Sequence, residues 1–192
     1  MSSIDLKTLK ICRAVPTANG AIKICKIEKQ DRSDAHWTST DTTETPFTPS
    51  CYEEGNRPNR LSLDLRCEGE YLEFFKSLDA WAIEQITING SSVFGKSFSY
   101  EEVKNMYRPC VRKSPSFDPL LRTKLTTGGY HPTRFWGTDR KSRKAPENWP
   151  TATLRTQIHI AYLYISESAC GLALECTDIQ VSEPSPITCP FA

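Results

Sequence analysis

The sequence lacks any long hydrophobic run, and this absence argues against a membrane-spanning helix. An apolar stretch from Ile158 to Ile165 is among the longest and is already interrupted by His159, whereas a helix needs about 20 predominantly apolar residues to cross a bilayer. The N-terminus also lacks the basic and then apolar layout of a secretory signal. We therefore predict an intracellular protein, in the nucleus or cytoplasm, with no membrane partner.

Paired cysteines are also missing. The chain has eight cysteines, but no two of them form a C-x-x-C pair, and zinc sites usually bring ligands two to four residues apart. Three cysteines, Cys25, Cys67 and Cys176, fall inside apolar strand patterns, where a free thiol acts as a small core residue. We predict reduced, structural cysteines and no metal site.

The familiar motifs of catalysis are absent as well. The sequence contains no G-x-S-x-G, no H-E-x-x-H and no phosphate-binding G-x-x-x-x-G-K-[ST]. The three histidines, His36, His131 and His159, are far apart in sequence and have no recognisable partners. We predict a protein that is not an enzyme and has no cofactor. An enzyme of an unfamiliar kind would need His, Cys or carboxylate groups gathered in one pocket.

Net charge is nearly absent, but the charges are unevenly distributed. The whole chain has a formal charge of +1, yet residues 104–144 contain eleven basic and only two acidic residues. The remainder contains 13 basic and 21 acidic residues. Such asymmetry is typical of a surface that binds a polyanion. The alternative is a solvated loop with a chance excess of lysine and arginine.

Hydrophobic periodicity predicts mostly strands and one main helix. Alternating apolar residues indicate strands at 20–28, 61–67, 121–125, 151–165 and 172–181. A change of phase near Thr177 and Asp178 predicts a β-bulge in the last of these strands. Apolar residues at three- and four-residue spacing predict an amphipathic helix across about 70–86. Ser99 and Glu102 form a capping box that predicts a short helix from Tyr100 to about Met106.

These elements predict a mostly-β fold. Several strands, one helix in mid-chain and long loops fit a small Greek-key β-barrel of the OB-fold type, and a β-sandwich with a surface helix is the alternative. We predict a single domain over residues 1–182, with long loops at about 29–59 and 127–150. Residues 183–192, which contain three prolines, are predicted to form a C-terminal tail.

The basic region also contains aromatic residues. Proteins that bind single strands combine cations, which follow the phosphates, with rings that stack on exposed bases. We predict a basic groove and a closing loop at 130–149 from these residues: Tyr107, Arg108, Arg112, Lys113, Arg122, Lys124, Tyr130, Arg134, Phe135, Trp136, Arg140, Lys141, Arg143, Lys144 and Trp149. In the alternative interpretation, Phe135 and Trp136 anchor this loop to the barrel and only the cations reach solvent.

The order of several short motifs resembles a known family. The motifs lie at 61–65, 74–75, 78–79, 94–96, 99–102, 106–109, 120–125 and 171–181. This layout, over about two-thirds of the chain, is similar to the OB-fold single-stranded-DNA-binding proteins of large DNA viruses of the algal type. The resemblance implies a role in DNA replication, recombination or repair. The C-terminal tail departs from the acidic tails of phage proteins with comparable function, because Glu183 is its only charge.

The residues and the resemblance together predict a protein that binds single-stranded DNA, with RNA as a further candidate ligand. Phe191 in the tail is a candidate contact for a replication-protein partner. The alternative function is structural or scaffolding, in which the basic loop contacts an acidic protein or a packaged genome. The two functions differ in their salt response and in their preference for single over double strands.

Overall fold

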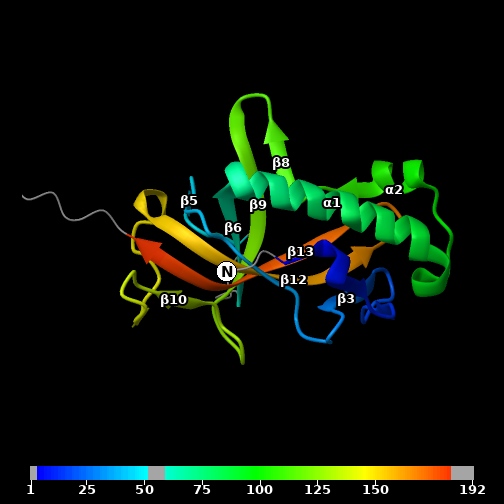
Figure 1. Cartoon of the computed structure of the whole chain (residues 1–192), viewed down its shortest axis with the longest axis horizontal. Helices are drawn as coiled ribbons and strands as arrows, with labels where there is room; N and C mark the ends of the chain where they lie inside the picture. The colour runs from blue at the N-terminus through cyan, green and yellow to red at the C-terminus, as the bar shows by residue number, and fades with distance from the viewer. Residues whose placement is uncertain (1–3, 52–58, 183–192) are drawn as a thin grey trace, which may run out of the picture.

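The computed structural model describes residues 4–51 and 59–182, which form one curled sheet with a long helix on one face (Figure 1). The sheet is a half-barrel, so the mostly-β, OB-like prediction is confirmed and the two-sheet sandwich is not observed among these residues. The strands are β1 (Leu9–Ile11), β2 (Val15–Pro16), β3 (Lys23–Lys29), β4 (His36–Thr38), β5 (Thr43–Glu44), β6 (Arg60–Arg66), β7 (Tyr107–Arg108), β8 (Val111–Ser114), β9 (Phe117–Thr126), β10 (Arg134–Trp136), β11 (Ser142–Arg143), β12 (Thr153–Ile165) and β13 (Cys170–Ser182).

The predicted helices are present. Helix α1 (Gly69–Asn89) buries one apolar stripe and continues into a π-helical turn at Gly90–Phe94, so it is longer than the sequence pattern indicated. Helix α2 (Tyr100–Met106) begins at the predicted capping box, in which Ser99 and Glu102 each accept a hydrogen bond from the other's backbone N–H. Short 3-10 turns lie at Leu6–Thr8 and Trp149–Thr151.

Strands β12 and β13 form the centre of the sheet. They pair as an antiparallel hairpin from Thr153 opposite Ser182 to Ile165 opposite Cys170. The register shifts where Gln157 pairs with Asp178 and Ile158 pairs with Cys176, so that Thr177 is the extra residue. The β-bulge predicted from the change of phase is therefore confirmed.

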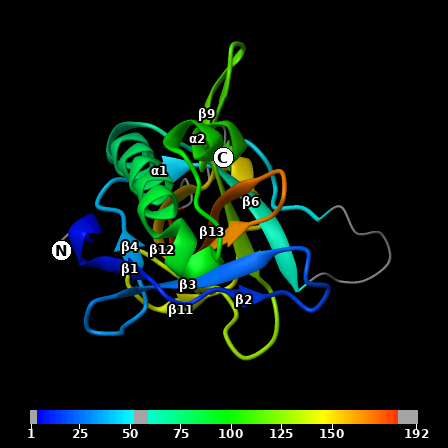
Figure 2. The same cartoon turned by 90° about the vertical axis from the view of Figure 1, so that its right-hand side faces the viewer.

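The remaining strands extend the sheet from this hairpin. β3, β4 and β5 pair with β12, while β7, β9 and β10 run parallel to β13. β6 and β8 both pair with β9 in antiparallel fashion. Because β9 is longer than its pairing with β6, its first residues and β8 form a two-stranded arm that stands away from the body in both views (Figures 1 and 2).

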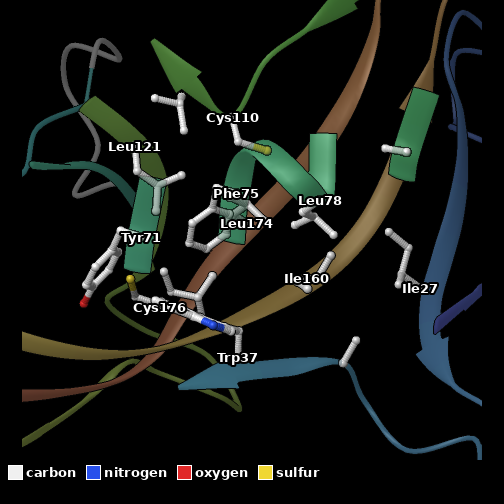
Figure 3. Packing of buried hydrophobic residues seen from close by; sticks show 14 of the residues in the cluster. Ile27, Trp37, Tyr71, Phe75, Leu78, Cys110, Leu121, Ile160, Leu174 and Cys176 are labelled. Carbon is white, nitrogen blue, oxygen red and sulfur yellow. The ribbon is translucent and has the colours of Figure 1, made fainter. Parts of the chain in front are cut away.

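The core lies between α1 and the sheet (Figure 3). Tyr71, Phe75 and Leu78 of α1 are buried, and Trp37 packs against the first two rings at 4.9 and 5.1 Å between ring centroids. Cys25, Cys67 and Cys176 are buried free thiols, as predicted. Burial raises the pKa of the Cys176 thiol to about 12, which favours the neutral form of a core residue.

The two predicted long loops contain more structure than their composition suggested. Segment 29–59 contributes β4 and β5, and Trp37 is only 2% exposed, so this segment helps to build the core. Segment 127–150 contributes β10 and β11. These strands are two or three residues long, which is too short for a period-2 pattern to register.

Two half-buried carboxylates attach α1 to neighbouring segments of the chain. Asp79 accepts hydrogen bonds from the Tyr107 hydroxyl at 2.8 Å and from the Cys110 N–H at 3.1 Å. Burial raises the pKa of Asp79, while these donors oppose the shift. Near the N-terminus of α1, Glu70 accepts hydrogen bonds from the N–H groups of Thr40 and Asp41, both at 2.6 Å.

Across the described ranges, no helix is long and apolar enough to span a membrane.

Candidate nucleic-acid interface

The face of the sheet opposite α1 carries polar, basic and aromatic side chains. Side chains alternate between the two faces of a strand. In β12, Leu163 and Ile165 are buried against the core, so Tyr162 and Tyr164 lie on the open face. In β9, burying Leu121 and Leu125 likewise turns Arg122 and Lys124 outward. The core pattern of the strands therefore decides which side chains reach the open face.

A groove of about 630 Å³ lies on this face. Its side chains come from β6, β7, β8, β9, β12 and β13, so the fold assembles it from distant parts of the sequence. Five basic and no acidic residues line it among the described residues. The lining residues are Cys51, Asn59, Arg60, Arg108, Pro109, Cys110, Arg112, Arg122, Thr123, Lys124, Tyr162, Tyr164, Leu172, Ala173 and Leu174.

Carboxylates just outside the groove hold two of its arginines. Arg122 makes a bidentate pair with Asp64, at 2.7 and 2.8 Å, across the β6–β9 register. Arg60 forms an ion pair with Glu175. These contacts fix the two guanidinium groups at the groove wall. The paired carboxylates partly offset the positive charge there.

Three other cations are not paired with a carboxylate among the described residues. Lys124 donates to the Ser62 hydroxyl at 2.8 Å. Partial burial lowers the pKa of Lys124, and the neighbouring Arg122 and Arg60 add to the shift. Arg108 and Arg112 are exposed and form no ion pair within the part of the chain that the structure describes. An anion in the groove would relieve the repulsion among these cations.

Two tyrosines supply aromatic surface between the cations. Tyr162 and Tyr164 are partly exposed and line the same groove. Burial raises the pKa of Tyr164, with smaller effects from Cys170 and Cys110, while Arg108 and Arg112 oppose the shift. Tyr164 is therefore a neutral phenol near two guanidinium groups. A ring beside cations is the arrangement that single-strand binding uses.

The groove brings together part of the predicted cluster and contains further residues. Arg108, Arg112, Arg122 and Lys124 come together as expected on one surface. Sequence reasoning missed Arg60, Tyr162 and Tyr164. The alternation of Tyr162 and Tyr164 in an otherwise apolar strand was the available signal, because period 2 places both rings on the face opposite Leu163.

Two predicted aromatic contacts are wrong. Tyr107 is only 6% exposed and donates its hydroxyl proton to Asp79, so it joins β7 to α1 instead of lining the groove. Trp149 is 7% exposed and meets Phe135 edge to face, with 5.9 Å between ring centroids. Phe135 is itself packed against the core. Trp149 and Phe135 thus anchor their segment, as the alternative interpretation expected of Phe135 but not of Trp149.

The 130–149 segment does not line the groove. Its strand β10 pairs with the far half of β13, and Arg134, Trp136 and Arg140 line a second hollow with Arg155. Trp136 is partly buried, and its indole N–H donates to Asp178 at 2.8 Å. The Arg134 guanidinium lies 5.8 Å from the Trp136 ring centroid. These residues form a separate basic and aromatic surface.

The remaining predicted contacts are dispersed. Tyr130 is fully exposed, Lys141 lies 3.6 Å from Asp139, and the Arg143 Nε–H donates to the Lys144 carbonyl. Lys144 is exposed at the end of this segment. Lys113 is exposed on β8, away from the groove lining. The predicted tail at 183–192, with Phe191, lies outside the described residues.

All three histidines line a third hollow, although they are far apart in the sequence. His36 and His159 stack with 4.8 Å between ring centroids, because β4 pairs with β12 and places them opposite each other. His131, Asp34 and Glu175 line the same hollow. Within residues 4–51 and 59–182, no group of three or more His, Cys, Asp or Glu has an arrangement that could hold a metal ion.

Comparison with known proteins gives a likeness of fold. No protein-family model and no curated protein sequence matches the chain. One similar solved structure is that of gp2.5, a single-stranded-DNA-binding protein of bacteriophage T7. The alignment covers 82% of this chain and 91% of the gp2.5 chain, with a TM-score of 0.55 and 10% sequence identity. A second is a single-stranded-DNA-binding protein of bacteriophage Enc34 in complex with single-stranded DNA. That alignment covers 92% of this chain and 97% of the Enc34 chain, with a TM-score of 0.47 and 10% sequence identity.

Proposed function

We propose that this protein binds single-stranded DNA without catalysing a reaction. The observation that carries the proposal is the groove opposite α1, where five basic side chains and two tyrosine rings meet with no acidic lining residue among those described. A continuous single strand offers what this surface fits, namely closely spaced phosphates and bases with exposed faces.

The cations and the tyrosines of the groove would bind different parts of the strand. Arg108, Arg112 and Lys124 are the cations without a carboxylate partner among the described residues, and they would contact phosphates. Tyr162 and Tyr164 lie two residues apart on one strand face, about 7 Å along β12, and would stack on bases. Stacking tolerates every base, so we expect weak sequence preference.

Two further points support the proposal. The gp2.5 structure shares this fold and is described as a single-stranded-DNA-binding protein. OB-type barrels commonly use an open sheet face and its flanking loops for oligonucleotides. The fold alone hosts other functions, so the proposal depends on the groove.

The resemblance to proteins of large algal-type DNA viruses supplies a place of action. We infer that the protein coats single strands during replication, recombination or repair, in the nucleus or cytoplasm of an infected cell. The tail at 183–192 would recruit a replication protein through Phe191. RNA remains a second candidate ligand, because neither stacking nor phosphate contact requires deoxyribose.

Fluorescence anisotropy with labelled oligo-dT, oligo-U and a duplex of equal length tests this proposal at two salt concentrations. We expect oligo-dT to bind more tightly than the duplex and to lose affinity at the higher salt concentration. The double variant Tyr162→Ala/Tyr164→Ala should bind oligo-dT more weakly, whereas Tyr100→Ala, which removes an exposed tyrosine from α2, should not. Equal binding of all three probes would instead favour the scaffolding function.

A further inference from the structure

The arm formed by β8 and the first residues of β9 exposes apolar surface that the fold does not use. Phe117, beside the Pro115–Ser116 turn at its tip, is 75% exposed. Phe47 is 59% exposed and lines the same shallow hollow. Large rings exposed together on a surface commonly mark a binding site.

The charge around these rings is positive. Arg66, Arg112 and Lys113 line the hollow, and Asp118 is the single acidic residue among the described residues that line it. Arg66 is paired with Asp118 and lies 3.6 Å from Glu44. Arg112 and Lys113 are exposed and have no ion pair among the residues that the structure describes. The occupant of the hollow should therefore be an anion with an apolar or aromatic part.

The arm is continuous with the groove. Arg112 lines both the groove and the arm hollow, and its cross-strand partner is Leu120, which lines the hollow as well. A phosphate held by Arg112 would place the next nucleotide of the same strand over the arm. In the views from two sides, the tip of the arm projects beyond the rest of the sheet and beyond α1 (Figures 1 and 2).

We propose that the tip of the β8–β9 arm is a second nucleotide-binding site, in which Phe117 and Phe47 stack on bases and Arg112 and Lys113 hold the adjoining phosphates. This inference rests on the proposed function, because it extends the path of the single strand beyond the groove. It predicts that the arm adds to the length of strand that one protein molecule covers.

A length series of oligo-dT, from about 4 to about 16 nucleotides, separates the two sites. Phe117→Ala should weaken binding of the longer oligonucleotides by about five- to 150-fold, the loss expected for a stacked base. The shortest oligonucleotides, which fill only the groove, should bind Phe117→Ala and the unmutated protein equally. Ile88→Ala, which removes another highly exposed apolar side chain, here from α1, should leave binding of every length unchanged.

Two further variants distinguish stacking from apolar contact. Phe117→Tyr should bind the longer oligonucleotides as well as the unmutated protein does, whereas Phe117→Leu should bind as weakly as Phe117→Ala. The fluorescent base 2-aminopurine can be placed at successive positions of a long oligo-dT. Its fluorescence should be quenched at positions in the groove and at positions near one end, over the arm. Phe117→Ala should remove only the quenching near that end. Full rescue by leucine would contradict stacking and point to an apolar partner.

The outcomes for the arm and for the groove are distinct. If Phe117→Ala binds every length as the unmutated protein does, the arm site is refuted while single-strand binding stands. If Phe117→Ala weakens the shortest oligonucleotides as much as the longest, the arm is not a separate site. If the unmutated protein binds no length of single strand, the proposed function itself fails. Equal melting temperatures of the variants would exclude misfolding, as expected for an exposed side chain.

Discussion

Tyr164 lies across the backbone of Gly171, its antiparallel partner in the central hairpin. A Cβ atom at position 171 would come within 2.8 Å of the Tyr164 hydroxyl oxygen and 3.0 Å of the Arg108 carbonyl oxygen. The absence of a side chain at this one position therefore leaves room for the Tyr164 ring in the groove beside β7. The relationship links a glycine in β13 to the proposed stacking surface.

We expect Gly171→Ala to displace the Tyr164 ring and to weaken binding of oligo-dT. The loss should approach that of Tyr164→Ala, about 1–3 kcal/mol. Combining the two substitutions should cost little more than either alone, because both act through the same ring. Anisotropy titrations of the two single variants and the double variant measure this coupling. Fully additive losses would show that Gly171 acts elsewhere.

Glu175 limits the charge of the groove through its ion pair with Arg60. Glu175→Gln should release Arg60 for a phosphate, so affinity for oligo-dT should rise and the salt dependence should steepen by roughly 0.7 in log–log slope. Glu73→Gln, on the exposed side of α1, is the matched control and should leave both quantities unchanged. A weaker complex with Glu175→Gln would mean that the pair positions Arg60 for binding.

The stacked histidines predict a pH dependence of stability. Burial lowers the pKa of His159 below 6.5, and the neighbouring His36 lowers it further, while Asp34 and Glu175 oppose the shift. Below pH 6.5 the unfolded chain therefore binds more protons at this group than the folded protein does. The free energy of unfolding should decrease as the pH falls from 6.5 toward the folded pKa.

Melting temperatures between about pH 5 and pH 7.5 test this effect, the window in which an ordinary histidine titrates. His159→Gln should flatten the pH profile, because a glutamine does not titrate. His131→Gln, which alters an exposed histidine of the same hollow, should leave the profile steep. Identical profiles for the His159→Gln and unmutated proteins would contradict the assignment.

Long periodic elements were predictable from the sequence. The stripe of α1, the Ser99–Glu102 capping box and the bulge at Thr177 each come from local patterns that fix backbone geometry directly. Strands of two or three residues, such as β4 and β10, are too short to show the alternation of apolar and polar residues that predicts a strand. Their positions depend on pairing with β12 and β13 across more than 40 residues.

The candidate site was predictable only in part. Arg122 and Lys124 share a strand face, so their common surface followed from alternation. Alternation also places Tyr162 and Tyr164 on one face of β12, but only strand pairing brings that face and Arg60 beside Arg122 and Lys124. Tyr107 resembled a groove residue because it precedes Arg108 in the basic region. Its hydroxyl instead donates to the half-buried Asp79 carboxylate of α1, on the other side of the sheet.

Trp149 provides a test of the corrected assignment. Trp149→Ala should lower the free energy of unfolding by about 3–5 kcal/mol, because it empties a buried site next to Phe135. The folded protein should still bind oligo-dT with unchanged affinity at low temperature. Tyr130→Ala, at a fully exposed ring, should not change the melting temperature. Weakened binding by a stable Trp149→Ala protein would return this residue to the interface.

If the groove opposite α1 binds the phosphates of a single strand, its cations that lack a carboxylate partner among the described residues should set the salt dependence of oligo-dT binding. The triple variant Arg108→Ala/Arg112→Ala/Lys124→Ala should bind more weakly than the unmutated protein, with a log–log slope shallower by about 2, or roughly 0.7 for each lost contact. The control variant Lys7→Ala/Lys76→Ala/Lys104→Ala removes three exposed lysines that do not line the groove and should keep the original slope. Equal slopes for the two triple variants would show that these groove cations do not bind the phosphates.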